Sequence, residues 1–212
     1  MHYTELLRGV NSYASGNDSQ ANTFPNIHYV EEKIGDRSYS ELIANKGTPP
    51  TLLPSNIEYL LSKWNWRVPI NKKELKKAVE QVSDNVRTWD LAEMNLWEYH
   101  GEINRIFLHF INTGLSKKNY TGASKTLHCL NPRFFMMWDM EIRYGYGCCE
   151  SEEGYFNFLL RCQKEIKEII STYVHDYPSC PEISRRIYKG LPKSLLKLLD
   201  EYNIEKYTNK RI

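Results

Sequence analysis

Lys125 and Asp139 are the two residues whose types and spacing best suit chemistry. They lie 14 positions apart in the segment YTGASKTLHCLNPRFFMMWDMEIRYGYG, residues 120–147. Lys125 falls near the start of an expected helix, where the partial positive charge of the amino end disfavours a cation. Desolvation among aromatic side chains would lower the pKa of this lysine and make it a possible nucleophile near neutral pH. The pattern therefore indicates two ionisable groups presented to one cleft.

The residues between these two groups define how they are positioned. A helix expected over 122–130 ends at Asn131-Pro132, and an apolar connector runs from Phe134 to Trp138. Asp139 then stands where the N-cap of a helix over 139–147 belongs. A simpler interpretation stays open beside the catalytic one: Asp139 only caps its helix, and Lys125 only reaches solvent.

The rest of the chain predicts an all-α fold. Apolar residues recur at i, i+3, i+4, i+7 and i+8 from Ile103 to Ile111, which predicts a helix over 93–113, and a similar pattern predicts one over 152–174. No series of segments shows the alternation of a sheet. Asn71 and Ser55 are candidate N-caps. Shorter helices are expected over 3–14, 38–46, 55–64, 71–83, 182–189 and 193–202.

The segment 120–147 resembles the catalytic core of the helix-hairpin-helix DNA glycosylase superfamily. The resemblance is carried by Gly122-Ala123-Ser124-Lys125-Thr126 and by Trp138-Asp139-Met140-Glu141-Ile142-Arg143, with Gly147 near the closing glycine. It matches Lys125 to the family's catalytic lysine, Asp139 to its catalytic aspartate and Arg143 to its arginine. The spacing from Lys125 to Asp139 also resembles that of small uncharacterised all-helical proteins.

The sequence departs from the family pattern at two points. The family's L-P-G-V-G hairpin is replaced by Ser116-Lys117-Lys118-Asn119-Tyr120-Thr121-Gly122. The lysine-to-aspartate spacing is shorter than usual by about one helical turn of roughly 3.6 residues. Lys117 and Lys118 replace the backbone amides of the hairpin as the expected phosphate contacts. The cysteines do not match the family's iron–sulfur pattern, so no cofactor is expected.

The resemblance implies a single all-helical domain over 1–212 with two lobes around a cleft. One lobe would comprise about 1–115 with the C-terminal helices, and the other, over about 116–180, would hold the lysine and aspartate. It also implies base excision from DNA: Asp139 stabilises positive charge on the sugar, and Lys125 either attacks C1′ or positions the DNA. The base enters an aromatic pocket, for which the candidates are Trp138, Trp64 and Trp66. The expected DNA contacts are Lys117, Lys118, Thr121, Gly122, Ser124 and Arg143.

Charge and composition limit the classes of protein to which this chain can belong. The chain has 28 Lys+Arg and 26 Asp+Glu, and its positive charge is concentrated in two blocks, 61–130 and 185–212. The blocks favour one cationic face. We expect four of its residues to add affinity for phosphates: Lys193, Lys197, Lys210 and Arg211. The lysines of 72–77 also fit the solvent-exposed side of a helix. No apolar run is long enough for a membrane span, and the amino end shows no signal peptide, so we expect a cytoplasmic protein. The resemblance implies a partner that is duplex DNA with a flipped base, and we expect a monomer.

The five cysteines form no CxxC pair, and the histidines show no zinc-ligand spacing, so we expect neither a bound metal nor a structural disulfide. Two other functions compete with the glycosylase interpretation. One is a nucleic-acid-binding protein without enzymatic activity, in which Asp139 is only a cap. The other is a helical protein-interaction or defence module.

Overall fold

The computed structural model describes residues 1–16, 70–82, 84–113, 119–176 and 194–212. Throughout these ranges the regular elements are helices, and no strand is present. The all-α prediction is confirmed for this part of the chain. The helices expected over 38–46, 55–64 and 182–189 lie outside the described residues, as does the candidate cap Ser55.

The elements follow one another from the amino end in the order α1, α5 to α9 and α11, with short 3₁₀ and π turns between or after them. The helices are α1 (Tyr3–Gly16), α5 (Lys72–Glu80), α6 (His100–Asn112), α7 (Tyr120–Leu130), α8 (Met140–Gly145), α9 (Glu152–Asp176) and α11 (Leu195–Asn203). The short turns are η1 (Asp84–Thr88), η2 (Leu96–Tyr99) and η3 (Ile204–Asn209).

Local capping chemistry sets several of the helix ends. The side chain of Asn71 accepts a hydrogen bond from the Glu74 N–H at 3.2 Å, as expected for the start of α5. The helix expected over 93–113 divides at Tyr99 into the 3₁₀ turn η2 and the helix α6. The apolar face predicted for it is nevertheless correct, because Ile103, Phe107 and Phe110 are fully buried.

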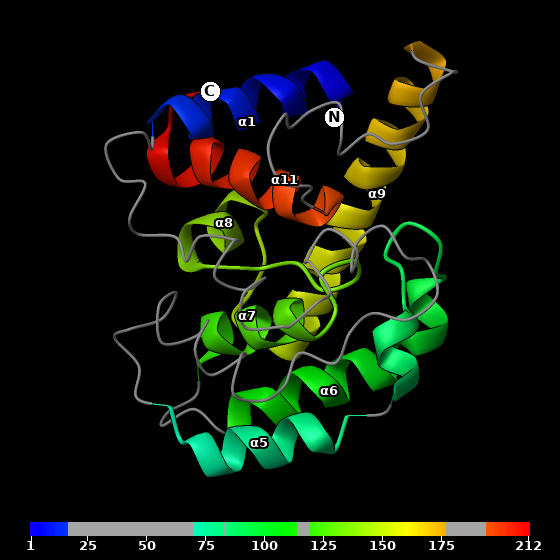
Figure 1. The fold of residues 1–212 in the computed structure, drawn as a ribbon, viewed down its shortest axis with the longest axis vertical. Helices are drawn as coiled ribbons and strands as arrows, with labels where there is room; N and C mark the ends of the chain where they lie inside the picture. The colour runs from blue at the N-terminus through cyan, green and yellow to red at the C-terminus, as the bar shows by residue number, and fades with distance from the viewer. Residues whose placement is uncertain (17–69, 83, 114–118, 177–193) are drawn as a thin grey trace, which may run out of the picture.

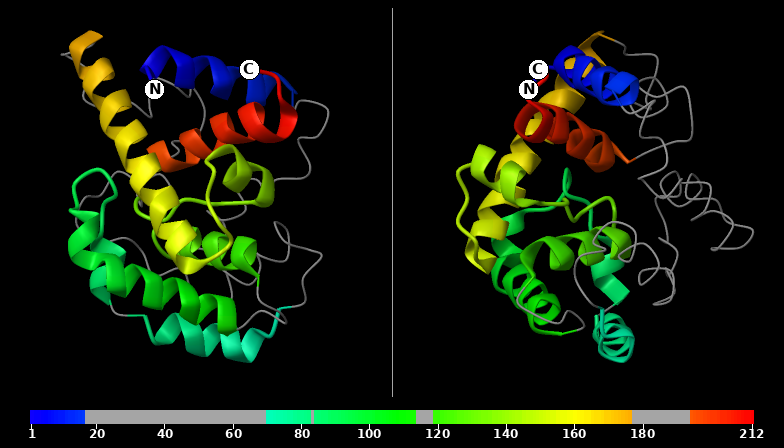
Figure 2. Two further views of the ribbon diagram at one scale, coloured as in Figure 1. Left: turned by 180° about the vertical axis from the view of Figure 1, so that it is seen from behind. Right: turned by 90° about the vertical axis from the view of Figure 1, so that its left-hand side faces the viewer.

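The helices stack in levels, with α1 and α11 at one end, α8 and α7 in the middle, and α6 and α5 at the other end (Figure 1). The long helix α9 passes along these levels, and two further views show the same order (Figure 2). The helix α1 packs on α11 and α9, and α6 packs on α7 and α9. One continuous hydrophobic core joins the levels, from Leu6 in α1 to Tyr202 in α11.

Hydrogen bonds from polar side chains attach the irregular segments between the helices to the rest of the fold. Asn131 is fully buried, and its side-chain amide donates to the carbonyls of Val86 and Trp89 at 3.0 and 2.8 Å. The Tyr155 hydroxyl donates to the Met136 carbonyl at 2.8 Å. These bonds fix the connector between α7 and α8, because the Asn131 side chain satisfies buried carbonyls of Val86 and Trp89 and α9 satisfies the Met136 carbonyl of the connector.

Candidate functional site: Lys125 and Asp139

Ser124 joins the helix that carries Lys125 to the connector that ends at Asp139. Its hydroxyl oxygen accepts a hydrogen bond from the Trp138 N–H at 3.1 Å and lies 3.2 Å from the Trp138 carbonyl oxygen. Ser124 is fully buried, so water does not compete for these contacts. The bonds join α7 to the end of the connector one residue before Lys125 and one residue before Asp139. The two ionisable residues are therefore held on neighbouring segments.

Asp139 adopts the extended conformation of an N-cap, and its carboxylate accepts from the Ile142 N–H at 3.0 Å. The expected helix start at this position is confirmed, and capping is one role of the residue. Burial raises the pKa of Asp139 above its ordinary value, and the nearby charge of Asp200 raises it further. The Ile142 hydrogen bond and the charge of Lys125 act in the opposite direction. The carboxylate remains half-buried, so it keeps contact with solvent.

Lys125 is also half-buried, on α7. Burial lowers its pKa below the ordinary value of a lysine, and the charges of Asp200 and Asp139 oppose that shift only in part. The charge of each of the two groups therefore acts on the pKa of the other. A lysine with a lowered pKa near the charge of a carboxylate is a pattern typical of functional sites.

Helix α11 contributes charged residues that sequence reasoning did not place at the site. Lys197 is buried and donates to the Asp200 carboxylate at 2.6 Å, while Glu201 lies 4.0 Å away. The prediction that Lys197 binds phosphate is wrong, because its ammonium group is enclosed and paired. A clue was present in the sequence, since Lys197, Asp200 and Glu201 have the i, i+3 and i+4 spacing of helix ion pairs.

Buried His128 is a further neighbour of this group. Its Nδ1 lies 2.7 Å from the Phe135 carbonyl oxygen, which assigns the ring proton to Nδ1 in the neutral form. Burial lowers its pKa from 6.5 to about 4, against opposing effects of the Phe135 carbonyl and the charge of Asp200. The Nε2 atom is buried and has no hydrogen-bond partner within the described part of the chain. His128 is therefore a neutral core residue at physiological pH.

Trp138, expected as a wall of the base pocket, is instead a core residue. Its ring is fully buried and lies 5.2 Å from the Tyr155 ring and 5.6 Å from the Phe158 ring, measured between centroids. It offers no surface for a base to stack on. The other two candidates for the pocket, Trp64 and Trp66, lie outside the described residues.

Arg143 and two of the α7 residues expected at the DNA are already used within the protein. Arg143 is 5% exposed, pairs with Glu150 at 2.7 Å and lies over the Trp138 ring. The Gly122 N–H donates to the Asn119 side chain at 2.7 Å. Ser124 is fully buried and bonded to Trp138, as described above. The structure therefore contradicts their assignment as phosphate contacts. Thr121 is half-buried, and its DNA contact stays a prediction, whereas Lys117 and Lys118 lie outside the described residues.

The described residues form a pocket of about 150 Å³ elsewhere, between α5, η1 and α6. Neither Lys125 nor Asp139 lines it.

Among the described residues no group of three side chains is arranged to hold a metal ion, and no helix is long and apolar enough to cross a membrane. Cys129, Cys148, Cys149 and Cys162 are free thiols, and Cys180 lies outside the described ranges.

No family model, curated protein or solved structure matches this chain. The geometry of the residues themselves is thus the basis for a functional proposal.

Proposed function

We propose that the protein is a DNA glycosylase that excises a damaged or modified base, with Lys125 and Asp139 as its reacting groups. The observation that supports the proposal is the hydrogen bond from the Trp138 N–H to the buried Ser124 hydroxyl, which joins the segments carrying Lys125 and Asp139, together with the shifted pKa values of both residues. The helix, apolar connector and aspartate-capped helix follow the order that the family resemblance implies. A cleft between two lobes, duplex DNA as partner and a monomeric cytoplasmic protein belong to the same proposal.

Asp139 supplies the negative charge that the reaction needs. Departure of the base from C1′ leaves positive charge on the deoxyribose, and a nearby carboxylate stabilises that oxocarbenium-like state. Because Asp139 is only partly buried and has a raised pKa, we expect the rate of base release to rise as the pH increases through that raised value. Lys125 lowers the pKa of Asp139, so its removal shifts this rise to higher pH.

Lys125 has two possible parts in the reaction. A neutral amine attacks C1′ and forms a C–N bond while the base leaves with the electron pair of the glycosidic bond. In the other case water attacks and Lys125 positions the DNA. Borohydride present during turnover reduces a Schiff base to a stable protein–DNA adduct. An adduct formed by the wild type and absent in Lys125→Gln identifies the lysine as the nucleophile, whereas base release without an adduct assigns the attack to water.

Asp139→Asn tests the proposal itself. Asparagine caps a helix about as well as aspartate, so α8 and the stability of the protein should be retained. The missing negative charge should reduce base release by about a hundredfold or more. The substrate is genomic DNA treated separately with nitrite, peroxide or a methylating agent, and the released bases are identified by mass spectrometry.

Glu141→Gln is the matched control, because it removes an exposed carboxylate from the first turn of the same helix. It should leave base release unchanged. Full activity of Asp139→Asn, or no release by the wild type from any of these DNAs, would contradict the proposal. Loss of the folded state in Asp139→Asn would show that capping is the main role of Asp139.

A further inference from the structure

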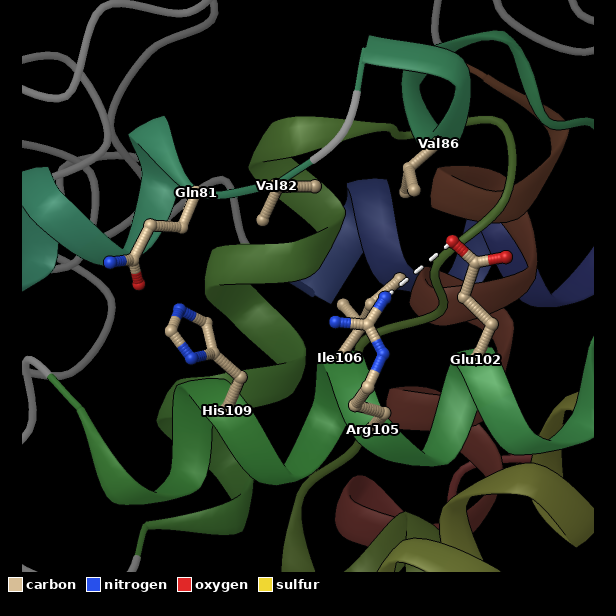
Figure 3. A pocket seen from close by; sticks show the side chains of 7 residues that line it. All are labelled: Gln81, Val82, Val86, Glu102, Arg105, Ile106 and His109. Carbon is tan, nitrogen blue, oxygen red and sulfur yellow. Dashed lines mark ion pairs between the residues drawn. The ribbon is translucent and has the colours of Figure 1, made fainter.

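The pocket between α5, η1 and α6 combines an apolar floor with a polar rim (Figure 3). Val82, Val86 and Ile106 form the floor and are 8%, 1% and 4% exposed. The pocket volume of about 150 Å³ is close to that of protein cavities that hold a single aromatic ring. A ligand of this size would lie flat on the three aliphatic side chains. The rim consists of Gln81, Glu102, Arg105 and His109.

The two charged residues of the rim are adjacent but not joined by a hydrogen bond. Arg105 Nη2 lies 3.7 Å from Glu102 Oε1, which exceeds hydrogen-bonding distance. The Arg105 side chain is 72% exposed and that of Glu102 is 30% exposed, so their ion pair contributes little to stability. The guanidinium therefore keeps donors, and the carboxylate keeps acceptors, for a third group between or beside them. Figure 3 shows both side chains at the same end of the pocket.

The opposite end of the pocket is fixed by His109. Its Nε2 lies 3.3 Å from the Ala78 carbonyl oxygen, which ties α6 to α5. The exposed amide of Gln81 stands beside it with one donor and one acceptor group (Figure 3). The pocket is thus bordered by hydrogen-bonding groups at both ends, while its floor stays apolar.

The signs of the two rim charges select the class of ligand. An anion that approaches Arg105 is repelled by Glu102, and a cation that approaches Glu102 is repelled by Arg105. A neutral planar molecule with an N–H donor next to a carbonyl acceptor satisfies both charges, because the N–H donates to the carboxylate and the carbonyl accepts from the guanidinium. Such an amide edge on a single ring is the chemistry of a pyrimidine base.

We propose that this pocket binds a neutral, planar heterocycle with an amide edge, of the size of a pyrimidine base. Glu102 accepts from the N–H of the amide edge, and Arg105 donates to its carbonyl. The ring packs on Ile106, Val82 and Val86. The site is separate from Lys125 and Asp139 and does not depend on the proposed glycosylase activity.

Uracil is the probe for this site, with benzoate and benzamidine as an anion and a cation of similar size. NMR titration of the full chain follows the methyl groups of Ile106 and the ring of His109. Uracil should cause saturable shifts with a Kd in the millimolar range, as expected for a ligand of so few atoms. Benzoate and benzamidine should each bind about tenfold more weakly.

Two variants of the rim charges, neither of which is a core residue, separate binding from folding. Arg105→Gln and Glu102→Gln should each weaken uracil binding by about tenfold, the effect of losing a charged hydrogen bond. Lys164→Gln, which removes an exposed cation on α9, should leave it unchanged. Ile106→Phe fills the floor and should abolish binding. The absence of saturable shifts with uracil, tighter binding of benzoate or benzamidine, or unchanged binding in Arg105→Gln and Glu102→Gln would overturn the assignment.

Discussion

Two lysine–aspartate pairs in this protein have the same residue types and opposite electrostatic character. Lys197 and Asp200 are almost completely buried on α11 and are joined at 2.6 Å. Burial acts to lower the pKa of Lys197, but the charges of Asp200 and Glu201 outweigh it and raise that pKa. For Lys125 the balance is reversed, since burial outweighs the charges of Asp200 and Asp139 and lowers the pKa.

The difference shows that the balance between burial and nearby carboxylates, rather than residue type, decides in which direction the pKa of a buried lysine moves. Lys197 is held in the charged form by a direct hydrogen bond to a buried carboxylate, so it has no use as a nucleophile. Lys125 and Asp139 are half-buried, and each has its pKa shifted toward the neutral form. The α11 pair therefore belongs to the packed interior, while the shifted pKa values of Lys125 and Asp139 are those that the proposed chemistry needs.

The same substitution at the two lysines should have very different effects on stability. Lys197→Met leaves Asp200 and Glu201 buried without their cation and should lower the free energy of unfolding by about 3–5 kcal/mol. Lys125→Met removes a partly desolvated ammonium group and should change it by less than about 1 kcal/mol. Chemical denaturation of the two variants measures both values. Equal losses would remove the distinction between the pairs.

His128 is buried near the charges of Asp200 and Lys197 and should make the fold sensitive to acid. Its pKa is about 4 in the folded protein and about 6.5 when unfolded, so as the pH falls below 6.5 the unfolded chain binds the proton first. Stability is therefore complete above pH 6.5 and should fall by about 3 kcal/mol as the pH decreases to about 4. His128→Asn should flatten this part of the curve of unfolding free energy against pH. An unchanged curve would mean that His128 is not a buried neutral group.

Ser124→Ala should weaken the link between the two segments that carry Lys125 and Asp139. The variant leaves the buried Trp138 N–H without its acceptor and should cost about 1–2 kcal/mol of stability. Base release should fall further than the folded fraction does, because Lys125 and Asp139 lose their common anchor. Thr126→Val is the control, since the Thr126 hydroxyl donates to the Gly122 carbonyl within α7. Equal effects of the two variants on base release would contradict a positioning role for Ser124.

The sequence predicts local features of this molecule well. The apolar spacing in 100–112, the cap at Asn71 and the helix start at Asp139 follow from short-range rules, and the structure confirms them. These features depend on residues within one or two turns of each other, so the physics that determines them can be read along the chain.

Features that depend on distant contacts were missed. Lys197 was predicted to bind phosphate, but it is buried together with Asp200 and Glu201 on α11, a helix that packs against α1. Trp138 and Arg143 read as pocket and phosphate residues, yet packing against α9 and the pairing with Glu150 give them structural roles. Burial of a polar or aromatic side chain is decided by elements far away in the sequence, which residue spacing alone does not reveal.

Direct titration of the two lysines tests the central claim that Lys125 belongs to a reactive site and Lys197 to a structural one. Protein labelled with ¹³C at the lysine Cε is titrated by NMR, and the signals are assigned with Lys125→Gln and Lys197→Gln. We expect Lys125 to lose its proton at lower pH than the exposed lysines and Lys197 to lose it at higher pH. In Asp139→Asn the pKa of Lys125 should fall further, because the carboxylate raises it. The account would be contradicted by a Lys125 pKa that equals that of the exposed lysines and does not change in Asp139→Asn.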